Sequence, residues 1–475
     1  MLFADDLVAI DSTRNGIESQ AGMIATWCSD WGMKVGIKKC GIMCVGEKED
    51  QAAVREHERL RVCPIRMARQ VQEKGRIIRT VMEQVPVVDE YTYLGVLVRR
   101  DLDLKAMAKG RLKKAERALG SIQPFLATQA IPLMMRTMVL KTVLMASVLH
   151  GAEIWGMSQE RSRPAQVLVN KALRLLCGCK RSDKTVAVAA MWRELQVPPV
   201  HALASARRAR AFVKYPELMT WVATVLKYPV GDHVGAPGWA AGSRRWLKAN
   251  VPELLREGDH SPKAAYNDVL EAAWKKMEQA KSNSAGMPYM ERGFRQTSWA
   301  AVKAIPIGAR REQICLGRGL RAVSMCRMGA FYTARKLARL GLVPRRYETQ
   351  CPCCNQEGKG ETIEHLLVGC SKWNEERERY LGDILREVGR RCGMDESATC
   401  TIILGGENMG DRLDSWLPMR RDEQGTHDGE SVQRCAYQVA KFLQAITSMR
   451  SPILRQLGDA PSCRAKARKG RANPV

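Results

Sequence analysis

The chain has 475 residues, of which 45% are hydrophobic and 27% charged, and its formal net charge is +26. The length exceeds what one hydrophobic core usually serves, so we expect about three domains of roughly 150 residues each. The composition is that of a folded protein, and the excess of Lys and Arg indicates a polyanionic partner. Charge alone also fits a ribosomal-type or a membrane-surface protein.

The cysteines and the apolar segments bear on the compartment. Most of the 16 cysteines are scattered singly among helical patterns, which does not suit a disulfide scaffold. Asp5 and Asp6 interrupt the only early apolar run, so we expect no secretory leader. The most apolar stretch, Ile131 to Leu149, contains Arg136 and Lys141, as a buried amphipathic helix would. We therefore expect a reduced, intracellular protein without a membrane span.

The first elements in chain order are a hairpin and a helix. Residues 1–10 hold two short apolar runs joined by Asp5 and Asp6, which predicts a hairpin with the carboxylates at its tip. Asn15 and Glu18 form a capping-box-like start for a helix that ends at Gly32. The next elements predicted are strands at Lys34–Ile37 and Ile42–Val45, a charged helical stretch from Glu49 to Met82, and a strand at Tyr91–Val98.

Helical patterns dominate from Leu104 onward. An apolar stripe from Leu104 to Ile122 predicts a helix that stops at Pro124. Four cations stand four residues apart on this helix and form one basic ridge: Lys105, Lys109, Lys113 and Arg117. The ridge is either a nucleic-acid-binding surface or an ordinary solvated face. Further helices are predicted at Pro132–Trp155, Gln166–Leu176, Pro199–Lys214, Pro252–Leu340 and Val432–Ile446.

The acidic pair near the start is the first motif that suggests catalysis. Magnesium prefers hard oxygen ligands, so two carboxylates on a tight turn can hold it against the oxygens of a nucleoside triphosphate. Asp5 and Asp6 are therefore candidate Mg²⁺ ligands. An ordinary acidic turn is the alternative for such a short motif.

A cysteine and histidine cluster is the second such motif. Cys351, Cys354, His365 and Cys370 have the spacing C-x2-C-x10-H-x4-C. Zinc takes four soft or borderline ligands in a tetrahedron, and a module this small has too little core to fold without its metal. We expect a structural Zn²⁺ site, with Thr362 capping the helix that bears His365. Cys353 could replace a neighbouring cysteine as ligand, and a chance cluster of reduced cysteines is the other interpretation.

The motifs together resemble the reverse transcriptases of non-LTR (LINE-type) retrotransposons. Phe3-Ala4-Asp5-Asp6 resembles their aromatic-Ala-Asp-Asp hairpin, and Trp31–Cys40 resembles the Trp-Gly-x-x-x-Asn-x-x-Lys motif that follows it. Tyr93-Leu94-Gly95 matches the turn of their primer grip, and Val148–Trp155 resembles their Tyr-Gly-x-Glu-x-Trp element. The segment around His365 resembles their C-terminal Cys-Cys-His-Cys module, which implies nucleic-acid binding with help from Arg335, Lys336, Arg339, Arg345 and Arg346.

The resemblance implies roles for individual residues. Asp5 would be the main Mg²⁺ ligand and Asp6 an auxiliary one, and Lys39 would lie near the incoming nucleotide. Gly36 replaces the usual Asn of its motif. The family also has an aspartate and fingers upstream of this hairpin, so we expect that the chain alone does not polymerise DNA.

The resemblance further implies an α+β, predominantly helical fold. The expected parts are a partial palm at 1–100, a thumb at 101–180, a helical connection at 181–340, a zinc module at 341–380 and a C-terminal helical region with a basic tail at 381–475. The expected function is RNA-directed DNA polymerase, with an RNA template and a DNA primer as partners, in the nucleus. A non-enzymatic nucleic-acid-binding protein derived from such an element is the alternative.

Overall fold

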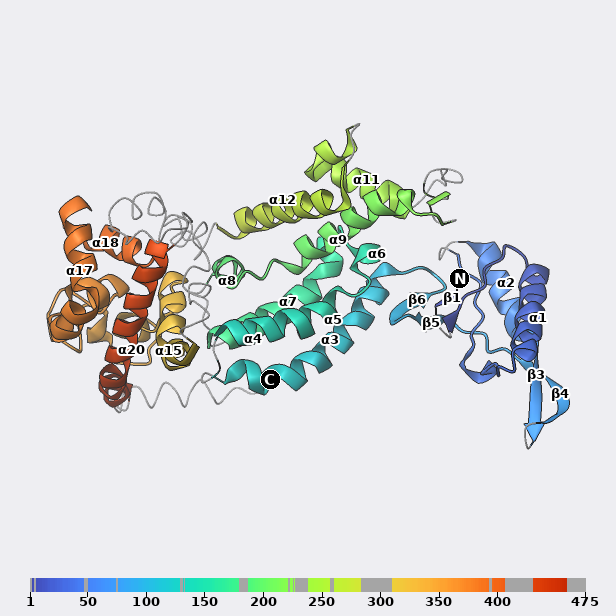
Figure 1. Cartoon of the computed structure of the whole chain (residues 1–475), viewed down its shortest axis with the longest axis horizontal. Helices are drawn as coiled ribbons and strands as arrows, with labels where there is room; N and C mark the ends of the chain where they lie inside the picture. Colours follow the sequence, from blue (N-terminus) through green and yellow to red (C-terminus); the bar gives the residue numbers. More distant parts are fainter. Residues whose placement is uncertain are drawn as a thin grey trace.

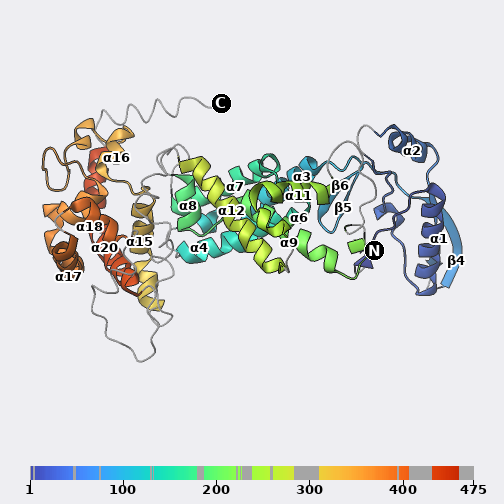
Figure 2. The same ribbon diagram turned by 90° about the horizontal axis from the view of Figure 1, so that it is seen from above.

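The computed structural model describes residues 2–3, 6–46, 50–73, 76–128, 131, 133–178, 187–220, 223–224, 226, 238–256, 260–282, 310–392, 395–405 and 430–458. These residues form an elongated molecule of three bodies in a row (Figures 1 and 2). We name them the N-terminal body (residues 2–99), the middle body (residues 104–282) and the C-terminal body (residues 310–458). Helices predominate and the sheets are small, which confirms the expected helical character of the fold.

The N-terminal body contains all the described strands, arranged as three antiparallel pairs. Its elements are β1 (Leu2–Phe3), β2 (Asp6–Leu7), α1 (Arg14–Asp30), η1 (Ile37–Lys39), α2 (Gln51–Val62), β3 (Arg66–Glu73), β4 (Arg76–Gln84), β5 (Glu90–Tyr93) and β6 (Val96–Arg99). The predicted first helix is confirmed, although Thr13 rather than Asn15 caps it, by accepting a hydrogen bond from the Gly16 backbone N–H. Gly32, with φ +64°, follows its end as expected.

Three expectations for the part of this body before residue 85 are wrong. The stretch from Glu49 to Met82 is not one helix, because α2 ends at Val62 and the β3–β4 hairpin follows. Pro64 explains the stop, since the residue before a proline is driven out of the helical region. The expected strands Lys34–Ile37 and Ile42–Val45 reduce to a short 3-10 turn and a single parallel bridge between Ile42 and Val87.

The predicted strand Tyr91–Val98 is instead the hairpin β5–β6. Its two turn residues, Leu94 and Gly95, have φ values of +47° and +78°. Two successive left-handed residues make the type of turn whose twist matches the flanking strands. The imidazole of His150 donates to the Leu94 carbonyl at 2.9 Å, and Arg111 donates to the Gly95 carbonyl at 3.0 Å. These bonds dock the turn onto the middle body.

The middle body is a stack of helices with two apolar clusters, the larger of which continues into the C-terminal body. Its elements are α3 (Leu104–Ala127), α4 (Leu133–Val139), η2 (Leu140–Met145), α5 (Ala146–Leu149), α6 (Ala152–Trp155), α7 (Gln159–Cys177), α8 (Val188–Glu194), α9 (Val200–Lys214), η3 (Tyr215–Glu217), α11 (Trp239–Asn250), η4 (Pro252–Leu255) and α12 (Pro262–Ser282). The helix predicted to stop at Pro124 continues to Ala127, with this proline in its last turn. Figure 1 shows α3 along one side of the stack and α11 along the opposite side.

Buried arginines hold this body together by donating to main-chain carbonyls. Arg136, 1% exposed, donates to the carbonyls of Leu126, Ile131 and Leu176 at 2.9 to 3.0 Å. Arg208, 4% exposed, donates to the carbonyls of α6 and α11. A planar guanidinium with five donors suits such convergent acceptors. Burial lowers the pKa of both side chains to about 10, so they remain charged at neutral pH.

The C-terminal body contains α15 (Arg310–Arg327), α16 (Ala334–Arg339), η6 (Arg345–Glu348), η7 (His365–Gly369), η8 (Ser371–Trp373), α17 (Asn374–Cys392), α18 (Glu396–Ile403) and α20 (Glu430–Gly458). Helices α15 and α20 lie side by side, and a Cβ on Gly319 would stand 2.1 Å from the Ala440 carbonyl oxygen. Two arginines of α15 reach the middle body. Arg321 donates to the Cys177 carbonyl at 2.8 Å, and Arg327 pairs with Glu194 at 3.0 Å.

A buried histidine of the middle body makes stability depend on pH. His201 is 6% exposed, its Nδ1 lies 3.4 Å from the Ser162 hydroxyl, and burial lowers its pKa from 6.5 to about 4. The unfolded state therefore binds a proton first as the pH falls. The free energy of unfolding should hold above pH 6.5 and lose about 3 kcal/mol as the pH falls to 4. Urea titrations of His201→Gln should lack this increment. If the free energy of unfolding depends on pH in the same way in the wild-type protein and in His201→Gln, the assignment to His201 is contradicted.

Candidate functional site

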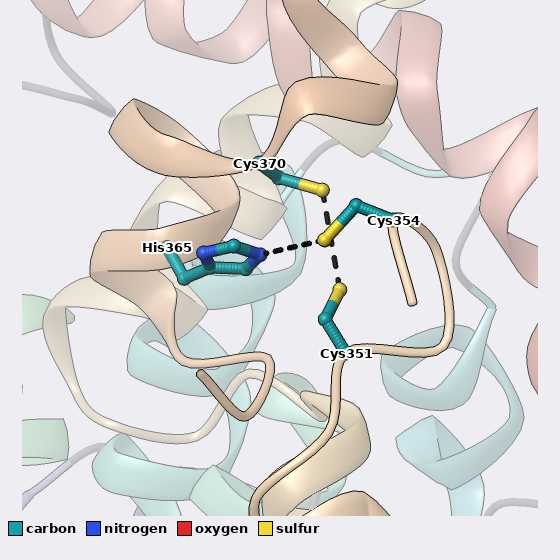
Figure 3. Close-up of side chains that lie close together, drawn as sticks. All are labelled: Cys351, Cys354, His365 and Cys370. Atoms are coloured by element: carbon teal, nitrogen blue, oxygen red, sulfur yellow. Dashed lines mark hydrogen bonds between the residues drawn. The ribbon is translucent and has the colours of Figure 1, made fainter. Parts of the chain in front are cut away.

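The four predicted zinc ligands come together in the C-terminal body. The side-chain donor atoms of Cys351, Cys354, His365 and Cys370 all lie within 4.8 Å of one another (Figure 3). The Cys351 and Cys370 sulfurs are 3.9 Å apart, and the His365 Nε2 is 3.4 Å from the Cys354 sulfur. Cys351 and Cys370 are fully buried, and His365 is 3% exposed. Three sulfurs and one imidazole nitrogen at these separations can hold a metal ion.

Local structure explains why the four side chains converge. Cys351 and Cys354 stand on one tight turn, in which the Asn355 backbone N–H donates to the Cys351 carbonyl at 2.9 Å. Asn355 has φ +59°, a conformation that asparagine tolerates better than most residues. The Thr362 hydroxyl accepts from the His365 backbone N–H at 3.1 Å, which is the expected cap. Cys370 follows η7 directly, so that short helix sets the distance between the last two ligands.

The thiols of the cluster influence one another. Hydrogen bonds from Cys353 and then from Cys370 lower the pKa of the Cys351 thiol. The same bond to Cys351, together with burial, raises the pKa of Cys353. Metals bind the thiolate and not the thiol.

Cys353 does not join the four converging atoms. Its sulfur faces the Glu361 carboxylate instead, 3.7 Å from Oε1. The sequence left open which two of these three neighbouring cysteines lie with His365 and Cys370. In the structure Cys351 and Cys354 do so. Trp373 is 1% exposed and packs in the core, so it is no stacking platform for bases.

Two side chains that the sequence analysis did not single out surround this cluster. Arg377 donates to the carbonyls of Leu367 and Cys370 at 2.9 and 2.7 Å, which holds the end of η7. Arg450 on α20 binds both carboxylate oxygens of Glu361, at 2.7 and 2.6 Å. Arg450 lies 89 residues from Glu361 in the chain, so no local pattern could have paired them.

The basic ridge lies on the solvent side of α3. Lys105, Lys109, Lys113 and Arg117 are all exposed, whereas Met107, Ala115 and Leu119 are buried on the other side of the helix. Lys105 pairs with Glu160 at 2.9 Å. Arg111 on the same helix points inward, to the carbonyls of Gly95 and Ser147. The Leu94–Gly95 turn therefore packs against the inward side of α3, where the exposed Lys114 amine also donates to the Gly95 carbonyl at 3.4 Å, and the ridge lies on the other side of the helix.

The five cations expected to support the zinc module differ from one another in exposure and in their partners. Arg339, Arg345 and Arg346 are exposed. Arg345 pairs with Glu348 at 3.4 Å, and Arg346 donates to the Tyr347 hydroxyl at 2.8 Å. The Lys336 amine donates to the Gly329 carbonyl at 2.9 Å, and Arg335 is half-buried. Most of these cations thus have partners within the protein.

The acidic hairpin is described only in part. β1 and β2 pair antiparallel, with Phe3 opposite Asp6, as the sequence predicted. Asp5 lies outside the described residues, and only the backbone of Asp6 is described. Lys39 is exposed at the end of η1, and its carbonyl accepts a hydrogen bond from the Tyr91 hydroxyl at 2.9 Å. This bond ties the Lys39 segment to β5, which leads into the Leu94–Gly95 turn.

No protein-family model, curated protein or solved structure matches the chain. None of the helices in the described ranges combines the length and the apolar character needed to cross a bilayer. The site must therefore be interpreted from its own chemistry.

Proposed function

We propose that the chain is part of the reverse transcriptase of a non-LTR retrotransposon and that it binds a template–primer duplex along α3. The observation that carries the proposal is the solvent-facing basic ridge of α3, the helix whose inward side holds the Leu94–Gly95 turn. Successive ridge residues are four apart, so their cations follow the helix axis at steps of about 6 Å. A row of this kind suits the phosphate backbone of a nucleic acid and carries no sequence preference.

Packing supports this use of the ridge. The buried face of α3 fixes the rotation of the helix, so the four cations cannot turn toward the core. Their side chains leave water only partly when they bind phosphate, which keeps the cost of desolvation small. The hairpin β5–β6, docked against the inward side of α3, would present Tyr93, Leu94 and Gly95 to the primer.

In the polymerase proposal, Asp5 and Asp6 hold Mg²⁺ in the intact enzyme. Carboxylates on a hairpin supply the hard oxygen ligands that this ion prefers, and bound Mg²⁺ would stabilise charge on the nucleotide phosphates. The antiparallel pairing of β1 with β2 supports the expected hairpin. Lys39 would stand near the pyrophosphate end of the nucleotide.

In the C-terminal body we propose a structural Zn²⁺ bound by Cys351, Cys354, His365 and Cys370. The donor set is soft, the separations suit a tetrahedron, and three of the four ligands are buried. The four protein atoms fill the coordination sphere, so no position remains for a substrate. The metal would stabilise the fold of this body and thereby fix the positions of the exposed arginines on its surface.

One observation favours the non-enzymatic alternative. Among the described residues the strands form only separate two-stranded pairs, so the nucleic-acid surface is better developed than the sheet behind the acidic hairpin. A protein with this surface and the metal centre would bind template–primer without extending it. Primer extension on an RNA template separates the two proposals once the upstream palm aspartate and fingers of such an enzyme are supplied, and extension that Asp5→Ala abolishes would establish the polymerase.

The ridge itself is tested by Lys109→Ala with Lys113→Ala. Each lost phosphate contact should lower the salt dependence of log K by about 0.9 for duplex, so the double variant should lose nearly 2 units of slope. Fluorescence anisotropy with a labelled RNA–DNA duplex, at several salt concentrations, gives this slope. Arg244→Ala with Lys248→Ala is the matched control, because these exposed residues are also four apart but lie on α11, across the middle body (Figure 1). Equal losses in both variants would rule out a dedicated ridge.

A further inference from the structure

Glu361 is a buried carboxylate inside the segment that carries the metal ligands. It lies between Cys354 and His365 in the chain, and its exposed fraction is 0%. A buried carboxylate is costly unless its oxygens are paired. Here Oε1 accepts from Arg450, and Oε2 accepts from Arg450 and from the Ala334 backbone N–H. The Cys353 thiol, beside two of the ligands, donates to Oε1 as well.

Arg450 joins this carboxylate to the long helix α20. Its guanidinium is 7% exposed and makes two parallel bonds to Glu361, at 2.7 and 2.6 Å. It also donates to the Tyr332 carbonyl at 2.8 Å and lies over the ring of Phe331, 5.2 Å from the centroid. Paired, planar bonds of this kind are directional and fix both partners.

The segment that carries Glu361 has little freedom to move. A Cβ on Gly360 would stand 2.4 Å from the Glu348 carbonyl oxygen, so main chain packs against main chain there. The Ala334 N–H that Glu361 accepts belongs to the first turn of α16, and α16 packs against Leu454 and Leu457 of α20. The ligand segment, α16 and α20 therefore meet at one carboxylate.

We propose that Glu361 and Arg450 are positioning residues of the metal centre and that they make the docking of α20 depend on bound metal. This inference rests on the zinc site proposed above. Metal fixes the turn from Cys351 to Cys354 and the segment up to His365, and this holds Glu361 where Arg450 can bind both its oxygens. By linkage, the docked Arg450 must strengthen metal binding by the same factor. In other proteins, partners that hydrogen-bond a ligand directly change metal affinity by about 10- to 100-fold. Glu361 and Arg450 act on the segment between the ligands and not on a ligand atom, so this range is the most that we expect.

Zinc titration of the full chain against a chelating indicator tests whether Glu361 and Arg450 position the metal ligands. Arg450→Met, Arg450→Lys and Glu361→Gln should each weaken zinc binding, by at most about 10- to 100-fold. Arg450→Lys keeps the charge and the fold but cannot make two parallel bonds. Arg193→Met is the matched control, because Arg193 is also buried and binds both oxygens of Glu278, but in the middle body. Its zinc affinity should equal that of the wild-type protein.

Hydrogen exchange tests whether the docking of α20 depends on bound metal. Chelation of zinc should speed amide exchange in residues 440–458 of the wild-type protein and leave α12 unchanged. In Arg450→Lys, these residues should exchange faster already with zinc bound. Unaltered zinc affinity in the three variants, or exchange of α20 that ignores the chelator, overturns the inference and leaves the zinc site intact. A wild-type chain that binds no zinc overturns both, so the two failures are distinguishable.

Discussion

Cys354→Ser and Cys370→Ser should each abolish stoichiometric zinc binding and unfold the segment between residues 345 and 373. The free energy of metal binding is folding free energy in isolated zinc-binding peptides, about 10 kcal/mol or more at neutral pH. Here Leu366, Leu367 and Trp373 join the main apolar core, contrary to the expectation of a module without core, so that figure is an upper bound. Cys370 is fully buried, so its loss removes a ligand and leaves a polar oxygen in an apolar site. Elemental analysis of the purified chain, with thermal unfolding followed by circular dichroism, measures both effects.

Cys353→Ser is the control for these two variants. Its sulfur faces Glu361 and lies outside the cluster, so this variant should keep one zinc per chain. A chain that lost zinc with Cys353→Ser and kept it with Cys354→Ser would reverse the ligand assignment. Chelation of the wild-type protein should reproduce the unfolding seen in Cys354→Ser.

Breaking the ion pair between Glu194 and Arg327 should cost about 3–5 kcal/mol of stability, because each substitution removes the opposite charge paired with a buried partner. The two side chains are 0% and 1% exposed and 3.0 Å apart. They join the end of α8 to the end of α15, so they connect the middle and C-terminal bodies. Glu194→Gln and Arg327→Met, each measured by denaturant unfolding, test this cost.

The double variant sharpens the test. Removing both partners leaves no lone charge, so its cost should fall well short of the sum of the single variants. Lys105→Ala provides the exposed comparison. Its pair with Glu160 has side chains 67% and 72% exposed, and such pairs contribute at most about 1 kcal/mol. Single-variant costs below that level for Glu194 or Arg327 would show that the pair does not secure the junction.

The sequence predicted those parts of the structure that depend on local chemistry. The metal ligands share a spacing that only a few folded geometries satisfy, and the four predicted residues converge. The ridge on α3 follows from helical periodicity alone, because an apolar stripe at one side fixes what the other side presents to water. The end of α1 just before Gly32 follows from the left-handed conformation that glycine adopts readily.

The sequence-based predictions failed where contacts between distant parts of the chain determine the local structure. The β3–β4 hairpin was predicted as helix, because its Arg, Gln and Glu residues favour helices and its few apolar residues fit either period. Met67 of β3 is buried together with Ile37 and Val85, and this packing selects the strand. The Glu361–Arg450 pair was missed for the same reason, since it joins segments that meet only in the folded C-terminal body.

The inward-facing arginines limit how the chain interacts with a polyanion. Arg111, Arg136, Arg208, Arg377 and Arg450 are all buried and donate to main-chain carbonyls, and Arg450 also pairs with a carboxylate. They add to the formal charge of +26 but cannot touch a bound phosphate. Fewer counterions can thus be displaced than the formal charge suggests, and tolerance to salt should exceed what composition implies. At these positions the guanidinium group stabilises the protein interior through its hydrogen bonds and takes no part in binding a polyanion.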